Sequence, residues 1–274
     1  MLSLQSTVRR ARGFTLTELA IAFLVISLLL GGMLMTLSAQ NEGRQLADTQ
    51  RTLDNAREAL IGFAARYGRL PCPAVDGATG DELQRNAANA YTCQVCAVTD
   101  AYCEGMLPAL TLGIGPIDRQ GYLVDAWGNR VRYTVSNWVF DAGGFNLANC
   151  VAKQYKYCPA FTTASAIASL GMTNAPAFNN QPPMVMICDV AACSGVRFYA
   201  PAVVWSPGRN YLEKLGPPPT FGADEAANLN TPADGIFVMH ETRVGNAAGG
   251  EFDDIVTWIS PSVLYSRLVS AGAL

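Results

Sequence analysis

The sequence is poor in charge and in histidine. Only 15% of its 274 residues are charged, against roughly 25% in an average soluble protein, and the single histidine is His240. One histidine excludes any metal site built from several histidine ligands. The net charge of −3 and the pI of about 5.2 argue against a nucleic-acid partner, because phosphate recognition needs a clustered basic face.

The sequence also has no nucleophile elbow, phosphate-binding loop or dinucleotide-binding glycine pattern, and these motifs mark common enzyme classes. His240 alternates with apolar residues and is interpreted as a structural or surface histidine. We therefore expect no enzyme, and no cofactor apart from the calcium discussed below. Apolar residues are plentiful, at 50% of the chain, which is enough to build a folded core.

A long uncharged run lies near the N-terminus. Arg9, Arg10 and Arg12 come first, and the 19 residues from 19 to 37 carry no charge. About 20 apolar residues span a bilayer as a helix, and basic residues beside such a helix stay on its cytoplasmic side. We therefore expect a transmembrane segment at about 14–37 in the bacterial inner membrane, with the bulk of the chain in the periplasm.

Three simpler interpretations of this segment compete. A secretory signal peptide would be cut after the apolar run, where Thr36-Leu37-Ser38 offers only a weak site before Ala39. A lipoprotein signal would need a cysteine just after the run, and the first cysteine is Cys72. A plain membrane anchor leaves Glu18 unexplained, because a carboxylate beside an apolar run costs free energy unless it has a partner.

A cut between Gly13 and Phe14 would explain Glu18. The new α-amine would lie one helical turn from this carboxylate and could pair with Glu18 of a neighbouring copy. The stretch Arg-Gly-Phe-Thr-Leu-Thr-Glu-Leu over residues 12–19 resembles the type III signal of type IV pilins and type II secretion pseudopilins. This resemblance implies that a prepilin peptidase cleaves after Gly13 and methylates the Phe14 amine, and that Glu18 acts in assembly.

The same resemblance implies further partners. These are other pilin or pseudopilin subunits, the inner-membrane assembly platform and membrane lipid, with a filament core made of bundled helices. One departure is that many major pilins carry a proline in the apolar helix and this chain has none there. Gly31-Gly32 is the weak point instead, either as a place where the helix loosens on assembly or as a close packing contact.

The helix is expected to continue well beyond the membrane. No proline interrupts residues 14–70. An apolar residue recurs at every seventh position, namely Leu46, Leu53, Leu60 and Tyr67. This spacing predicts one apolar stripe on a helix that ends near Tyr67, with Gly68 as its C-cap. The stripe is expected to pack under the protein's own head, and a coiled-coil partner is the alternative.

The rest of the chain predicts a sheet. Residues 71–130 look irregular because they are rich in glycine, proline, asparagine and aspartate. Strand patterns follow at 131–135, 185–188, 196–199, 202–206, 235–240 and 254–259. Pro261 starts a short amphipathic helix. The predicted fold class is α+β, a pilin-like long N-terminal helix on an antiparallel β-sheet head, divided into a leader at 1–13, the helix at 14–70 and the head at 71–274.

Two stretches of the head add to the resemblance. Residues 125–133 begin Asp-Ala-Trp-Gly-Asn and look like the stretch that starts the sheet of many pseudopilins. Residues 202–210, Ala-Val-Val-Trp-Ser-Pro-Gly-Arg-Asn, look like a strand and turn found in many pilin-like proteins. We expect both stretches to be structural, with Trp127 as a large buried anchor.

The eight cysteines favour disulfides, because the head is expected beyond the inner membrane. Short loops favour the pairs Cys150–Cys158 and Cys188–Cys193, which leaves Cys72, Cys93, Cys96 and Cys103 to pair among themselves. A zinc knot at Cys93-x-x-Cys96 with Cys103 is one alternative, and a redox Cys-x-x-Cys is another.

Three acidic residues follow a glycine-rich loop, namely Glu251, Asp253 and Asp254. Clustered carboxylates can hold calcium through their oxygens, although the loop lacks EF-hand spacing. The alternatives are a solvated turn, or Asp254 bonded to backbone amides.

The sequence thus predicts a structural subunit of a type IV pilus or a type II secretion pseudopilus. The large cysteine-rich head suggests a minor subunit, with a tip or adhesive role. The alternative function is a membrane-anchored periplasmic domain, such as a hydrolase, that forms no filament.

Overall fold

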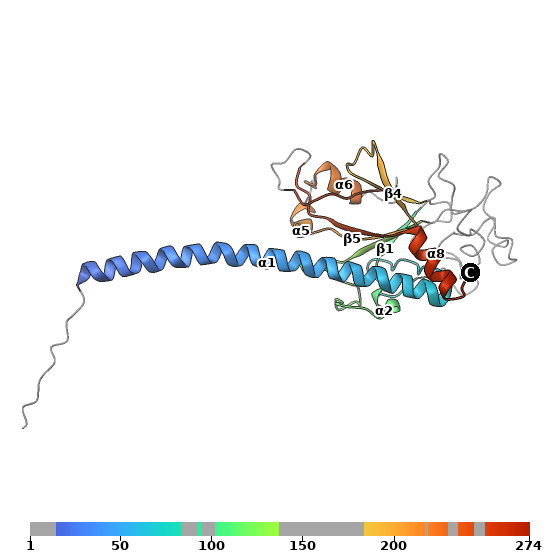
Figure 1. The fold of residues 1–274 in the computed structure, drawn as a ribbon, viewed down its shortest axis with the longest axis horizontal. Coiled ribbons are helices and arrows are strands. Elements are labelled where there is room, and N and C mark those ends of the chain that lie inside the picture. The colour runs from blue at the N-terminus through green and yellow to red at the C-terminus, as the bar shows by residue number, and fades with distance from the viewer. Residues whose placement is uncertain are drawn as a thin grey trace, which may run out of the picture. The chain divides into compact units, whose positions relative to one another are not determined.

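The described structure begins with one long helix, α1 (Leu16–Tyr67), which is 52 residues long (Figure 1). The computed structural model describes residues 15–83, 93–94, 102–136, 184–216, 219–229, 235–243 and 250–274. The chain divides into two units, residues 1–46 and 47–274. The predicted long N-terminal helix is confirmed, and its second half, with all of the other elements, belongs to the second unit.

The second half of α1 buries the predicted apolar stripe. Leu53 and Leu60 are at most 1% exposed, and they pack in a cluster with residues of the head. The stripe therefore packs on the protein's own chain. Two stripe residues are less buried: Leu46 is only half-buried, and Tyr67, where the helix ends, is 49% exposed. Gly68 adopts a left-handed conformation and donates its N–H to Ala64 O at 2.7 Å, as a C-cap does.

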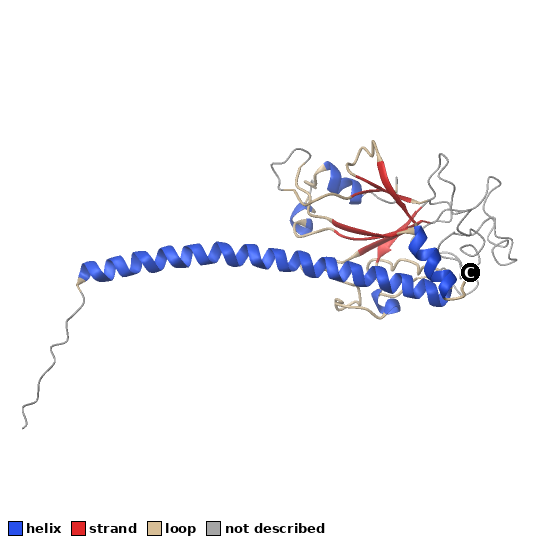
Figure 2. Cartoon of the chain, viewed as in Figure 1, coloured by secondary structure: helices blue, strands red, loops and turns tan. Residues whose placement is uncertain are grey.

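In the described part of the head, the strands form two β-sheets (Figure 2). The first has four strands in the order β1-β2-β5-β7, all antiparallel. Its strands are β1 (Tyr102–Met106), β2 (Arg132–Ser136), β5 (Ala202–Ser206) and β7 (Ile255–Ile259). The second has three strands in the order β4-β3-β6. They are β3 (Val185–Cys188), β4 (Val196–Ala200) and β6 (Ile236–Val238). The predicted α+β class with an antiparallel sheet is confirmed.

One pairing differs from the purely antiparallel prediction, because β3 and β6 run parallel. A long connection through α5 (Tyr211–Lys214) and α6 (Ala223–Leu229) separates β4 and β5 from β6, and such a connection allows a parallel return. The predicted strand at 235–240 is also too long, since β6 ends at Val238.

Strand β5 lies at the centre of the head, and all five of its residues are buried. Its side chains alternate between two apolar clusters. Ala202 and Val204 belong to the cluster that contains the second half of α1, and Val203 and Trp205 belong to the cluster with β3 and β6. Because successive side chains of a strand point to opposite faces, the first sheet has a covered layer on both sides.

The closing helix is confirmed as α8 (Pro261–Ser270), which buries Leu264, Tyr265 and Leu268. Sequence patterns missed β1 and the short helix α2 (Ala109–Leu112) within the stretch taken as irregular. Strand β1 contains Glu104 and Gly105 and lacks a clean alternation. Its pairing with β2 over five residues stabilises the extended conformation, which the local sequence pattern does not predict.

Candidate functional site

The first turn of α1 contains the predicted assembly residue Glu18. Thr15 donates its backbone N–H to Glu18 Oε2 at 2.9 Å, and its hydroxyl donates to the same oxygen at 2.8 Å. In return, Glu18 N lies 3.3 Å from Thr15 Oγ1. This reciprocal pattern is a capping box, in which Thr15 is the N-cap and Glu18 is the third helical residue. The sequence signal was present as Thr-x-x-Glu, and the sequence interpretation overlooked it.

The helix begins at Leu16, so the predicted cleavage point between Gly13 and Phe14 precedes it. Gly13 and Phe14 themselves lie outside the described residues. The turns that follow expose large apolar side chains, with Leu16 at 86%, Ile21 at 64% and Leu28 at 71%. Within the described ranges, no helix combines the length and apolarity that a membrane crossing needs. The span expected at about 14–37 therefore stays a prediction.

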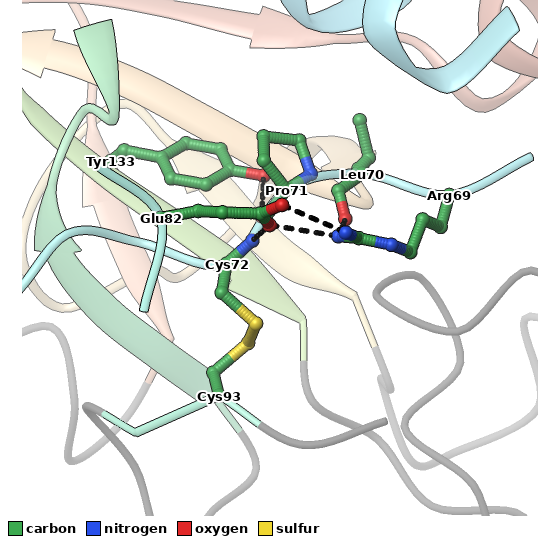
Figure 3. The surroundings of a disulfide bond; sticks show 7 residues. All are labelled: Arg69, Leu70, Pro71, Cys72, Glu82, Cys93 and Tyr133. Carbon is green, nitrogen blue, oxygen red and sulfur yellow. Dashed lines mark hydrogen bonds and ion pairs between the residues drawn. A yellow bond between two sulfur atoms is a disulfide. The ribbon is translucent and has the colours of Figure 1, made fainter. Parts of the chain in front are cut away.

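The end of α1 is fastened to the head by a polar junction, which we define as Arg69, Pro71, Cys72, Glu82 and Tyr133 (Figure 3). Arg69 contacts Glu82 through both terminal nitrogens, at 2.9 and 2.8 Å. Glu82 Oε2 also accepts the Cys72 N–H at 3.1 Å, and Tyr133 donates its hydroxyl to Pro71 O at 3.2 Å. Burial raises the pKa of Tyr133 well above its usual value, so its phenol remains a donor at neutral pH.

A disulfide joins Cys72 to Cys93 in the same junction (Figure 3). A second joins Cys188 to Cys193, which is the pair that the short loop suggested. Cys103 is also disulfide-bonded, and the predicted participants Cys96, Cys150 and Cys158 lie outside the described residues. Because the Cys93 sulfur is bonded to Cys72, the alternatives of a zinc knot and of a redox Cys93-x-x-Cys96 pair are wrong for this structure.

The two stretches that resemble pilin-like proteins meet each other. The buried Asp125 carboxylate accepts the Ser206 hydroxyl at 2.6 Å through Oδ2, while Oδ1 accepts the Trp127 and Asn129 N–H groups. Asn129 Nδ2 donates to Gly208 O at 2.5 Å. The expectation that Trp127 is the buried anchor is wrong, since its side chain is only half-buried. A buried polar network of Asp125 and Asn129 holds the two stretches together instead.

Thr49 ties this network to α1. Its hydroxyl accepts the Ala126 N–H at 3.1 Å, and Thr49 is fully buried among the helix residues that face the head. Burial raises the pKa of Asp125, although the hydrogen bonds from Ser206, Asn129 and Trp127 oppose that rise. Hydrogen bonds from the 125–129 turn thus reach both β5 and α1.

The three acids predicted as calcium ligands have separate partners. Asp253 Oδ2 accepts the N–H groups of Arg209 and Asn210, at 2.9 and 3.1 Å. Asp254 accepts the Asn228 amide at 2.7 Å, and Glu251 lies 3.4 Å from Lys214 Nζ. In the part of the chain that the structure describes, no group of three acidic, histidine or cysteine residues is arranged to hold a metal ion. Calcium binding stays a prediction without a ligand cluster to support it.

The position of the Asp253 carboxylate also explains why residue 208 is a glycine. Gly208 has φ +72°, and a Cβ there would lie 2.3 Å from Asp253 Oδ1, so a side chain would collide with the carboxylate. Burial raises the pKa of Asp253 to about 6, and burial raises the pKa of Asp254 well above its usual value. Asp253 and Asp254 are therefore interpreted as structural residues of the folded head.

Comparison with known proteins gives a match at the N-terminus. Residues 8–34 match the family described as the prokaryotic N-terminal methylation motif. No curated protein and no solved structure matches the chain. The motif is the signature of the prepilin signal of type IV pilins and pseudopilins, so the predicted signal is confirmed. It implies processing by a prepilin peptidase, association with other pilin subunits and a membrane-anchored or pilus-associated location, and proteins that carry it are generally structural.

Proposed function

We propose that this chain is a structural subunit of a type IV pilus or a type II secretion pseudopilus, cleaved by prepilin peptidase and assembled through α1. The observation that carries the proposal is the methylation motif at residues 8–34. The motif precedes and overlaps a 52-residue helix whose second half is fixed to an α+β head. The proposed work is mechanical, with the first half of α1 in a filament core and the head on the outside.

Exposed apolar surface supports these different roles for the first half of α1 and for the head. Large apolar side chains that are half or more exposed recur over residues 16–29 of α1, including Leu19, Phe23 and Leu28. Covering such side chains is favourable by roughly 25 cal/mol for each Å² removed from water. Lipid would cover them before assembly at the inner-membrane platform, and neighbouring subunits would cover them in the filament. The size of the head supports a minor subunit.

Glu18 has a defined place in this proposal. Both contacts from Thr15 end on its Oε2. After cleavage at Gly13, the methylated amine of Phe14 on a neighbouring copy would donate to the Glu18 carboxylate, and this charged pair would set the register between subunits. The attraction between an amine and a carboxylate is screened less by water in an apolar surrounding than at an exposed site, so it is stronger there.

Mass spectrometry of the chain from cells tests the proposal. Wild type is expected to start at Phe14 with a methyl group, whereas Gly13→Ala, or deletion of the prepilin peptidase, is expected to keep the leader. A wild-type chain that keeps its original start, or that starts near Ala39, would overturn the proposal and favour a simply anchored or secreted periplasmic domain. A start at Phe14 without incorporation into sheared filaments would overturn the filament role alone.

A further inference from the structure

The two described sheets of the head each have two outer strands. These are β1 and β7 in the first sheet and β4 and β6 in the second. An outer strand presents backbone N–H and C=O groups along its edge, and such an edge pairs with a strand of another chain unless charge, proline or a covering segment prevents it. The four edges therefore show where this head can accept a further strand.

Two of these edges are covered by other parts of the chain. In β1, the backbone of Met106 exchanges two hydrogen bonds with Ala74, both of 2.9 Å. In β6, the Asn228 side chain accepts the Val238 N–H at 2.7 Å and donates to Val238 O at 3.2 Å. The Asn228 amide thus makes the hydrogen bonds that a neighbouring strand would make.

The other two outer strands differ in charge. Strand β4 contains Arg197, whose side chain is half exposed and forms an ion pair with Asp189, and charge on an edge strand opposes pairing with another chain. Strand β7 has the sequence Ile-Val-Thr-Trp-Ile, which contains no charge, proline or glycine. Its residues are all β-branched or aromatic, the types that favour strands. The sequence of β7 therefore suits further pairing.

The outer side of β7 is open in the described part of the head. All five residues of β7 pair with β5, from Ser206–Ile255 to Ala202–Ile259. Among the described residues, no backbone hydrogen bond joins the other side of β7 to any segment. Because alternate residues of an antiparallel strand point their N–H and C=O groups away from the partner, this side keeps backbone groups for a further strand.

The side chains of β7 indicate what that strand would contain. Ile255 and Ile259 pack in the apolar cluster of the second half of α1, and Val256 and Trp258 pack in the cluster of β3 and β6. Trp258 is only partly buried and stacks on Phe198, with ring centroids 4.8 Å apart. Aromatic and β-branched residues on neighbouring strands stabilise each other. An added strand is therefore expected to be uncharged and rich in such residues.

A second copy of β7 does not suit this edge. The first sheet is antiparallel throughout, so an added strand is expected to run antiparallel to β7. Antiparallel pairing of two identical edges needs a two-fold axis, and that axis would also reverse the direction of α1 in the second copy. Subunits aligned in the proposed filament do not allow this reversal. The donor is therefore expected to be a segment of a different subunit.

We propose that the outer side of β7 accepts an extended, uncharged segment of another pilin-like subunit as a further strand of the first sheet. This rests on the proposed function, since the methylation motif supplies the class of partner. Backbone hydrogen bonds along β7 give the affinity, and the alternating apolar side chains give the specificity, as is general for strand addition.

Photo-crosslinking in cells tests the pairing. A photoreactive amino acid in place of Thr257 is expected to crosslink to a segment of another pilin-like subunit, which mass spectrometry of the crosslinked peptides identifies. The same amino acid in place of Val196, on β4 with Arg197 retained, is the matched control and should give no such crosslink.

Two substitutions test the role of charge at this edge. Thr257→Lys introduces a charge and should lower the amount of partner subunit that co-purifies in detergent by about fivefold. Thr257→Val keeps an uncharged β-branched residue and should retain the partner as wild type does.

Several outcomes would overturn the pairing. Equal crosslinking from Thr257 and Val196 contradicts a selective edge at β7. Crosslinks from Thr257 only to this chain, a second copy included, contradict the assigned donor. Equal partner yields in Thr257→Lys and Thr257→Val contradict the role of charge, and if the lysine variant does not fold, the crosslinks decide.

The same cells separate this proposal from the proposed function. A chain that starts at Phe14 and enters filaments, but gives no crosslink from Thr257, overturns the strand pairing alone. A chain that keeps its leader and stays out of filaments, yet crosslinks from Thr257 to a pilin-like subunit, overturns the filament role and supports the pairing.

Discussion

The two halves of α1 use apolar residues in opposite ways. In the first half, Leu16 and Leu28 are 86% and 71% exposed, whereas Leu53 and Leu60 in the second half are at most 1% exposed. The type of residue is the same, so composition does not explain the difference. The second half has its partners within the chain, at the face of the first sheet. The described apolar side chains of the first half are exposed, and the proposed membrane and filament would cover them.

Equivalent leucine-to-alanine changes in the two halves of α1 should lower the unfolding free energy of the head by very different amounts. Leu60→Ala is expected to destabilise the head by about 3 kcal/mol, because removing a fully buried leucine leaves a cavity and typically costs about 2–5 kcal/mol. Leu28→Ala, at a site that is 71% exposed, should leave the unfolding of the head unchanged. Denaturant unfolding of the full chain in detergent, followed by tryptophan fluorescence, measures both free energies. Equal losses in the two variants would contradict the comparison.

Two carboxylates extend the same comparison to charge. Asp253 is held inside the head and burial raises its pKa from 3.8 to about 6, whereas Glu18 is exposed in the first turn of α1. For an acid whose folded pKa is raised, the folded state binds the proton more tightly. The stabilisation by Asp253 is therefore complete below about pH 4 and is lost as the pH rises through about 6.

Asp253→Asn should remove this pH dependence. In wild type, we expect Asp253 to lower the unfolding free energy by about 1 kcal/mol between about pH 4 and pH 7, a figure reduced for the partial exposure of the carboxylate. The variant should lack this decline. Asparagine keeps an oxygen for the N–H groups of Arg209 and Asn210. Glu18→Gln is the matched control and should leave the profile of the head as in wild type. A wild-type profile in Asp253→Asn would assign the dependence to another acid.

The sequence predicted most of what local patterns control. The heptad stripe located the helix face that is buried at Leu53 and Leu60. Alternation located β2 within a residue, and a compact apolar run located β5. Gly68 and Pro261 marked helix boundaries because their backbone preferences act locally. The same holds for the N-terminal signal, whose residues are consecutive.

Features that depend on distant partners were not predictable. Nothing near Glu82 indicates that it would bridge Arg69 and Cys72, and nothing near Asp125 points to Ser206, 81 residues away. Trp127 was favoured as an anchor because aromatic residues bury large areas, yet the smaller Asp125 and Asn129 are the more deeply buried. The parallel pairing of β6 likewise depends on the path of the chain, which local alternation does not encode.

The smallest expected effect lies at the start of α1, where the helix holds itself together without the head. Thr15→Val removes the hydroxyl that contacts Glu18, and loss of an N-cap costs about 1 kcal/mol. Because the first half of α1 is not part of the head cluster, this loss should stay local. Hydrogen exchange should quicken about fivefold at the amides of the first turn, while the unfolding free energy of the head stays as in wild type.

Thr15→Ser separates the cap from the shape of the side chain. Serine keeps the hydroxyl and should retain the exchange rates of wild type, since serine and threonine are both good N-cap residues. If serine quickens exchange and valine does not, the methyl group rather than the hydroxyl stabilises the turn. If Thr15→Val lowers the unfolding free energy of the head, the two halves of α1 are energetically coupled. That result would contradict the proposal that the second half packs on its own chain while the first half packs on other molecules.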